Sequence, residues 1–366
     1  MTKLWWQQIK SVIRLEMKKT FFARRGLWIY ILALLPLLPF TAHTVFNARE
    51  RQRSRHIATR SDKALTYQDL LAVRPGMSSQ EVIALLGKPP IRFHWNDQRP
   101  IESGRVATIP REAYHYSDGA NDLLLDLTDG KVTGITIRKA YNLPEDSVVF
   151  AGVFQFFYLR LAVFFGCLGI FMNLFRGEIL DKSLHFYFLA PIRREVLMVG
   201  KFLAGLLATC VIFVTSELLQ IVVFTWSFSP NARDLYLYQN HGLAHSAAYL
   251  GITALACLGY GAFFLAAGML FRNPILPAGA ILAWEAVNPF LPALLKKFSV
   301  IYYLKSLCPV DIPSPPGASP LLSLLVSNPD PVSTPVAILG IVIVALLVLY
   351  ISSIQVRRME INYTTE

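Results

Sequence analysis

Residues able to do chemistry are few in this sequence, and they lie far apart. Glu217 and Glu285 are single carboxylates within long apolar runs. His241 and His245 are close enough to share a metal, but the glutamate of an H-E-x-x-H metalloprotease site is missing between them. None of the cysteines belongs to a C-x-x-C pair, and there is no nucleophile elbow or dinucleotide fingerprint. We therefore expect neither a catalytic centre nor a metal site.

ATP binding is equally unexpected. The sequence contains no G-x-x-x-x-G-K-[ST] loop. "LLGKPP" and "MVGKFL" each contain Gly-Lys, yet both lack the phosphate-cradling glycine and the hydroxyl that would hold magnesium. We expect the chain itself to bind no cofactor.

The composition is that of a membrane protein. Of 366 residues, 54% are hydrophobic and only 16% are charged, against about 25% in a typical soluble domain. The mean hydropathy is +0.44. The formal net charge of +11 comes largely from basic residues at the ends of apolar runs, which favours membrane orientation over nucleic-acid binding.

Several apolar runs approach or exceed the roughly 20 residues that span a bilayer. We predict an all-α polytopic membrane bundle of six transmembrane helices, at 27–46, 148–174, 198–227, 246–271, 274–295 and 334–355. Residues 1–26 precede them. Apolar residues at helical spacing between basic ones predict an amphipathic helix there, lying in the membrane interface.

Basic residues set the expected orientation. They are concentrated before the first run, around 176–194, at Arg272 and after the sixth run, whereas the short segment 228–245 holds only Arg233. The positive-inside rule then places both termini, including a tail at 356–366, in the cytoplasm. We expect a multi-pass protein of the cell (inner) membrane, with lipids as constant partners.

Two longer segments face outward in this topology. One is 47–147, inserted between the first two spans. The other is 296–333, whose short apolar patches predict re-entrant or capping helices at the outer leaflet. Within the first, the basic run 49–55 is either a solvated linker or a contact with lipid head groups.

Residues 64–139 are predicted to form a small α+β domain. Ser78 and Glu81 have capping-box spacing ahead of a helix, and "TDGK" is a hairpin turn. The expected strands are 91–95, 113–117, 123–127 and 132–138. "VRPGMSSQEVIALLGKPP", "YHYSD" and "LDLTDGKVTGITI" resemble the SmpA/OmlA lipoproteins of outer-membrane barrel assembly. The resemblance implies a protein-binding module with an envelope protein as its partner.

Segment 175–201, "FRGEILDKSLHFYFLAPIRREVLMVGK", separates the second and third spans. A short helix over 178–188 would place Leu180 and Leu184 on one face, and Pro191 would then break the chain ahead of basic residues. An amphipathic helix followed by a basic turn predicts a docking surface for a cytoplasmic protein.

This segment resembles the coupling loop of type-2 ABC exporter permeases. The shared pattern is a glutamate at the membrane exit, a Ser-Leu helix, a Pro-Ile turn with basic residues, and Gly-Lys opening the third span. The interfacial helix, the six spans and "GYGAFFLAAGMLFRNP" are similar in order. The resemblance implies that ATP and Mg²⁺ are bound by a separate cytoplasmic ABC ATPase, and that a second permease subunit completes a dimer, most simply a homodimer. The implied coupling residues are Glu178, Leu180, Lys182, Ser183, Leu184, His185, Pro191, Arg193, Arg194 and Lys201.

Two other functions stay open. One is a membrane-anchored envelope scaffold that recruits a protein through the insert. The other is a transporter driven by an ion gradient, which predicts intramembrane charge pairs and inverted repeats. Glu217 and Glu285 line a translocation path, make interhelical hydrogen bonds or lie near the outer interface.

Overall fold

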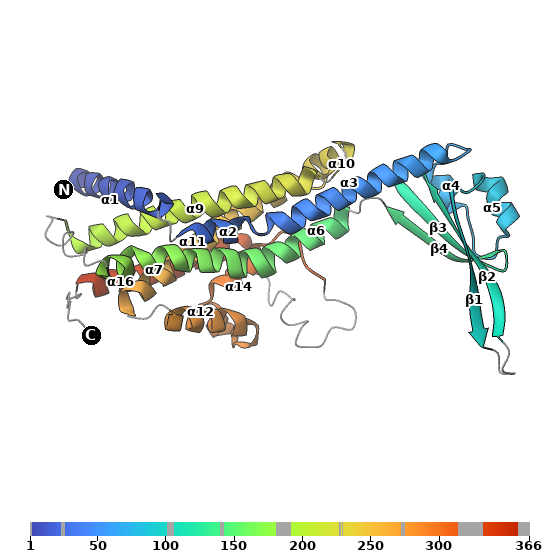
Figure 1. Ribbon diagram of the computed structural model, residues 1–366. Helices are drawn as coiled ribbons and strands as arrows, with labels where there is room; N and C mark the ends of the chain where they lie inside the picture. The colour runs from blue at the N-terminus through green and yellow to red at the C-terminus, as the bar shows by residue number, and fades with distance from the viewer. Residues whose placement is uncertain are drawn as a thin grey trace. The chain divides into compact units, whose positions relative to one another are not determined.

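The computed structural model describes residues 2–22, 26–100, 106–139, 143–180, 192–226, 228, 230–271, 275–313 and 332–357 (Figure 1). The chain divides into two compact units. The bundle unit comprises Met1–Phe40, Ser147–Thr225 and Pro230–Glu366, and the sheet unit comprises Thr41–Asp146 and Trp226–Ser229.

Helices make up the described part of the bundle unit. In chain order these are α1 (Thr2–Phe22), α2 (Leu27–Leu34), the start of α3 (Leu37–Arg60), most of α6 (Leu143–Gly152), the π-helix η2 (Val153–Val163), α7 (Phe164–Leu180), α9 (Arg194–Trp226), α10 (Pro230–Asp234), the π-helix η3 (Leu235–Gln239), α11 (Gly242–Leu270), α12 (Ile275–Val287), the 3-10 helix η4 (Asn288–Phe290), α13 (Ala293–Lys296), α14 (Val300–Leu307) and α16 (Thr334–Arg357).

Five helical segments among the described residues are long and apolar enough to cross a membrane, which supports a membrane protein. They are Leu27–Arg60, Asp146–Glu178, Arg194–Trp226, Gly242–Leu270 and Thr334–Arg357. Each overlaps one of the predicted spans.

The span predicted at 274–295 is wrong as a single helix. α12 has 13 residues, about 20 Å of helix, against a hydrocarbon core of about 30 Å. Pro289 and Pro292 follow it and cannot donate helical hydrogen bonds, so the chain turns through η4 and α13 before α14 begins.

Aromatic rings and glycines pack the bundle core. The Phe171 ring of α7 lies against two neighbouring helices, because a Cβ added at Gly205 of α9 or at Gly261 of α11 would fall 2.8 or 2.5 Å from it. Phe154 of η2 stacks edge-on against Tyr249 of α11, with ring centroids 4.6 Å apart. These contacts show that α11 runs in the same direction as η2 and α7.

The first and last helices of the bundle unit meet the start of α9. The Arg193 guanidinium lies over the Trp5 ring of α1, 5.1 Å from its centroid. Arg194 donates to the carbonyl of Arg357, at the end of α16, over 3.1 Å. α1 and the end of α16 are therefore at the same end of the bundle unit (Figure 1).

The sheet unit is an α+β fold, as predicted. Its elements are the rest of α3, α4 (Tyr67–Leu71), α5 (Ser79–Leu86), β1 (Ile91–Pro100), β2 (Val106–Ser117), β3 (Asn121–Thr128) and β4 (Lys131–Lys139). The antiparallel strand order is β1-β2-β3-β4. β1 and β2 are longer than predicted, since their ladder continues from Ile91–His115 to Pro100–Val106.

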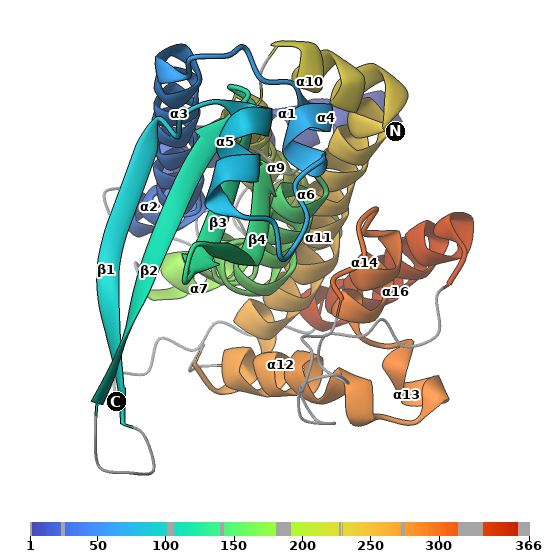
Figure 2. The ribbon, with the colours of Figure 1, turned by 90° about the vertical axis from the view of Figure 1, so that its right-hand side faces the viewer.

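Helices α4 and α5 cover one face of this sheet (Figure 2). The buried side chains between them are Leu70, Val73, Val82, Leu86, Tyr114, Tyr116, Leu123, Leu125, Leu127 and Val132. The capping box is confirmed, because Ser78 accepts from the Glu81 amide and the Glu81 carboxylate accepts from the Ser78 amide. Positive φ angles at Asp129 and Gly130 confirm the hairpin turn.

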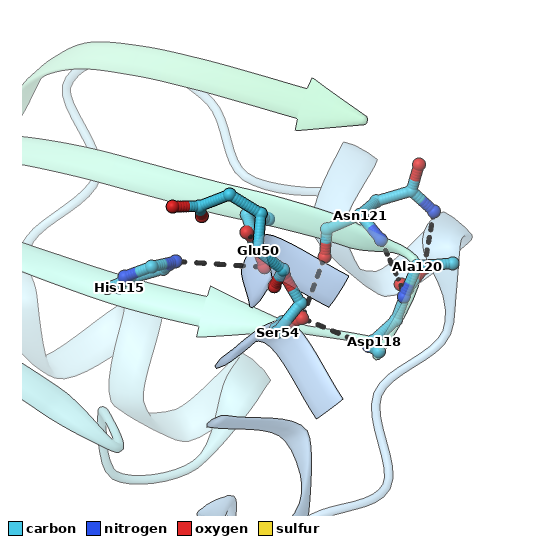
Figure 3. A network of polar contacts seen from close by, with 9 residues as sticks. Glu50, Ser54, His115, Asp118, Ala120 and Asn121 are labelled. Atoms are coloured by element: carbon cyan, nitrogen blue, oxygen red, sulfur yellow. Dashed lines mark hydrogen bonds and ion pairs between the residues drawn. The ribbon is translucent and has the colours of Figure 1, made fainter. Parts of the chain in front are cut away.

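The basic run 49–55 is helical rather than a linker, because α3 continues to Arg60. Ser54 joins this helix to the sheet through a 2.7 Å hydrogen bond to Asp122 (Figure 3). His115 lies 3.7 Å from the same carboxylate. Asp122 alternates with the buried Leu123, so α3 lies on the face opposite α4 and α5.

Three carboxyl groups make the sheet unit sensitive to acid. Hydrogen bonds from their N-cap residues lower the pKa of Asp69 and of Glu81. Burial opposes ionisation of Asp122, but the nearby His115 ring and the hydrogen bond from Ser54 outweigh it, so its pKa is also lowered. A lowered carboxyl pKa adds stability above the unfolded-state pKa, and that stability is lost as the pH falls through the folded pKa.

We therefore predict that the sheet unit loses stability below about pH 4. Hydrogen exchange of β3 amides in the full chain, corrected for intrinsic rates, should show falling protection there. Asp122→Asn should weaken protection at neutral pH and flatten its decline in acid. A decline as steep in Asp122→Asn as in the parent chain would contradict the role of this carboxylate.

Candidate functional site

Four charged residues meet at the end of the bundle unit that holds α1. Lys201 of α9 donates to Glu16 of α1 over 2.6 Å and to the carbonyl of Leu174 over 2.9 Å. Its ammonium lies 2.8 Å from one oxygen of Glu178, and Lys19 of α1 donates to the other over 3.0 Å. We call Glu16, Lys19, Glu178 and Lys201 the charge cluster.

Three separate helices supply the charge cluster, and each places its residue for a local reason. Glu16 and Lys19 are three residues apart, so they share a face of α1. Glu178 lies in the last turn of α7, and Lys201 lies in the second turn of α9. A Cβ at Gly200 would lie 2.9 Å from Val12 of α1, so this glycine permits the close approach that brings Lys201 to Glu16.

Burial makes the charge cluster energetically important. Lys201 is 0% exposed, Glu16 3% and Glu178 7%, whereas the Lys19 side chain is half-exposed. Two carboxylates and two ammonium groups compensate one another, as buried charges require. Burial raises the pKa of Glu16, although Lys201 opposes that rise.

The sequence-predicted coupling residues divide into two groups. Lys182, Ser183, Leu184, His185 and Pro191 lie outside the described residues, and only the backbone of Leu180 is described, as part of α7. The others lie at the base of the loop: Glu178 and Lys201 bind each other, Arg193 lies on Trp5, and Arg194 binds the end of α16. The described coupling residues thus flank the segment 181–191 on both sides.

Sequence reasoning missed the contribution of α1. Glu16 was assigned no role and Lys19 only one in membrane orientation, yet both complete the ion pairs that involve Glu178 and Lys201. A signal was present, because Glu16 is the only acidic residue before Glu50 in an otherwise basic N-terminal segment.

Glu217 is fully buried in α9, and neither carboxyl oxygen has a hydrogen-bond partner among the described residues. The neighbouring Ser216 donates to the carbonyl of Ala33, next to the break between α2 and α3. Pro36 causes that break by lacking an amide, and the Ser216 hydroxyl adds a hydrogen bond to a carbonyl of the turn that precedes it.

Glu285 has a structural partner at each oxygen. It accepts hydrogen bonds from the Ser299 hydroxyl at 2.8 Å, the Val300 amide at 3.0 Å and the Ile301 amide at 2.8 Å. These amides begin α14, so the carboxylate stabilises the positive end of that helix. Arg160 and Glu285 line one small cavity, so two opposite charges are near each other there, which sequence reasoning also missed.

Comparison with known proteins gives no relative: no family model, no curated protein and no solved structure matches the chain.

Proposed function

We propose that the chain is the membrane-spanning permease subunit of an ATP-driven exporter. The observation that carries the proposal is the charge cluster. It ties the amphipathic helix α1 to the two helices that enter and leave the loop 181–191. Buried ion pairs hold together the two helices on either side of this segment. A displacement of the segment by a cytoplasmic partner would therefore be transmitted to both spans.

The mechanism follows from this arrangement. A separate ABC ATPase, which would hold ATP and Mg²⁺, docks on the loop 181–191. Closure of the ATPase dimer displaces the loop, and Glu178 and Lys201 carry the displacement to α7 and α9 together. A second copy of the permease, related by a twofold axis, supplies the other half of the pathway, and tilting of the spans switches access.

The proposed topology keeps six crossings. α1 and the end of α16 are at one end of the bundle unit, which supports an even number of crossings. The fifth crossing is made in two pieces, α12 and α14, with Glu285 joining them at the break. Both termini are then cytoplasmic, and the segment 47–147 lies outside the inner membrane.

Sidedness gives a direct prediction for this topology. Protease added outside spheroplasts should cut within 47–147 and leave 176–195 intact. Opening the membrane should expose the second region. Protection of 47–147 together with cutting at 176–195 would show the opposite topology. The segment 181–191 would then face outward, where a cytoplasmic ATPase could not reach it.

The loop itself is tested by Leu184→Asp. A carboxylate in an apolar docking contact should weaken ATPase binding, so permease-dependent ATP hydrolysis in proteoliposomes should fall about tenfold or more. Leu184→Met is the matched control, since it keeps an apolar side chain of similar size. Unchanged hydrolysis in Leu184→Asp, with normal expression, would count against a coupling role for the loop.

A scaffold function has one observation in its favour. Phe93 and Trp95 on β1 are 53% and 42% exposed, and alternation places them on the same face of the sheet. Exposed aromatic side chains of this kind favour protein binding. If Phe93→Ser removes a co-purifying envelope protein and no ATPase is ever found, the scaffold is the better function.

A further inference from the structure

A large pocket opens on the side of the bundle unit, between α11, α12, α14 and α16. Its volume is about 630 Å³, within the roughly 300–1,000 Å³ of small-molecule sites. The walls include Phe263, Ile281, Trp284 and Leu347, and its charged side chains are Glu285 and Lys297. The lining is thus mostly apolar, with charged side chains only at Glu285 and Lys297.

The pocket opens where lipid would lie. α11 and α16 are among the helices able to span a membrane, and Ile343 and Leu347 at the pocket are 60% and 51% exposed. The position of the pocket along the spans can be inferred from Glu285. This residue lines the pocket and also shares a small cavity with Arg160. Arg160 is near the middle of the span Asp146–Glu178, so the pocket is near the middle of the spans.

Lys297 is the unusual group at this depth. Among the described residues its ammonium has no acidic partner within ion-pair distance, and the Glu285 oxygens are already bound to Ser299 and to the first amides of α14. A lysine held near the middle of a membrane is costly unless it meets a counter-charge. The pocket therefore offers an apolar wall and an unmatched positive charge.

We propose that this pocket binds a lipid with an anionic head group, its acyl chain against α16 and its phosphate or carboxylate at Lys297. Binding needs no ATPase. As a stage in export, which rests on the proposed function, the site would make an anionic lipid the exported substrate class.

The probe is phosphatidylglycerol with a photoreactive diazirine in its acyl chain, added to the purified full chain in phosphatidylcholine nanodiscs. Crosslinks should fall on Ile281, Trp284 or Leu347. Lys297→Gln should lower this labelling about tenfold through loss of the charge-assisted bond, and its neighbour Lys296→Gln, which does not line the pocket, should not.

A second pair of variants tests the apolar wall. Val344→Trp fills the pocket and should abolish labelling at these positions, whereas Leu346→Trp, on α16 but outside the pocket, should leave it unchanged. If the Lys297→Gln variant is merely destabilised, the Val344→Trp and Leu346→Trp pair still tests the site.

Three results would overturn the site. A phosphatidylcholine probe could label as strongly, labelling could spread evenly over all lipid-facing helices, or Leu347→Cys could crosslink efficiently between two copies, which would make the pocket a dimer interface. Failure to find an ATPase would leave the labelling standing. Loss of specific labelling with the ATPase still bound would remove the lipid site alone.

Discussion

Lys201→Met should destabilise the bundle unit by about 3–5 kcal/mol, the range for removing one partner of a buried ion pair. The methionine fills similar space, so the loss comes from two buried carboxylates, Glu16 and Glu178, that lose the buried ammonium group they share. Lys19 is half-exposed, so solvent screens its ion pair with Glu178 and it compensates little of that loss.

The four cysteines provide the measurement, because all lie in the bundle unit and Cys167 and Cys257 are buried. A thiol-reactive dye followed during heating reports unfolding of this unit alone. Lys18→Met is the control, since Lys18 is exposed on α1. The double variant Glu16→Gln with Lys201→Met should cost less than the sum of the single changes. Strict additivity would show that the two residues are not coupled.

Leu125→Ala should cost the sheet unit about 2–5 kcal/mol. Leu125 is 0% exposed between the sheet and the helices α4 and α5. Truncation leaves a cavity in a core of few residues, which has little capacity to collapse around it. We expect the sheet unit to unfold at a markedly lower temperature while the bundle unit keeps its melting temperature.

Two probes separate these outcomes. Hydrogen exchange of β3 and β4 amides reports the sheet unit, and thiol labelling reports the bundle unit. Leu124→Ala is the matched control on the same strand, because Leu124 is on the opposite face and only partly buried. A joint fall of both signals in Leu125→Ala would contradict the division into two independently packed units.

Local signals in the sequence were sufficient for much of the fold. The Ser78–Glu81 capping box and the Asp129–Gly130 turn were predicted correctly, since each depends on residues at most three apart. The five long spans were found because each is a nearly continuous apolar run.

The errors in the predicted elements arose where the amino-acid composition of a segment did not determine its backbone structure. The run 274–295 is apolar enough on average, but Pro289 and Pro292 lack the amides that a continuous helix needs. The outer half of β1 (96–100) is polar and that of β2 (106–110) is mostly apolar, and neither alternates, so their pairing gave no periodic signal.

The charge cluster shows a different limit. Glu178 and Lys201 were singled out as coupling residues, but their charges alone do not identify the partners they bind. Glu16 and Lys201 are 185 positions apart and meet only because α1 packs on Gly200. Long-range ion pairs of this kind follow from packing, which single-sequence patterns do not encode.

Purification of the chain from its native membrane tests the permease function most directly. We predict that a separate ATPase carrying a G-x-x-x-x-G-K-[ST] loop co-purifies in equal amount, that Leu184→Asp reduces its recovery, and that Lys18→Met does not. Absence of any such ATPase, even after mild crosslinking, would contradict the function proposed for this chain.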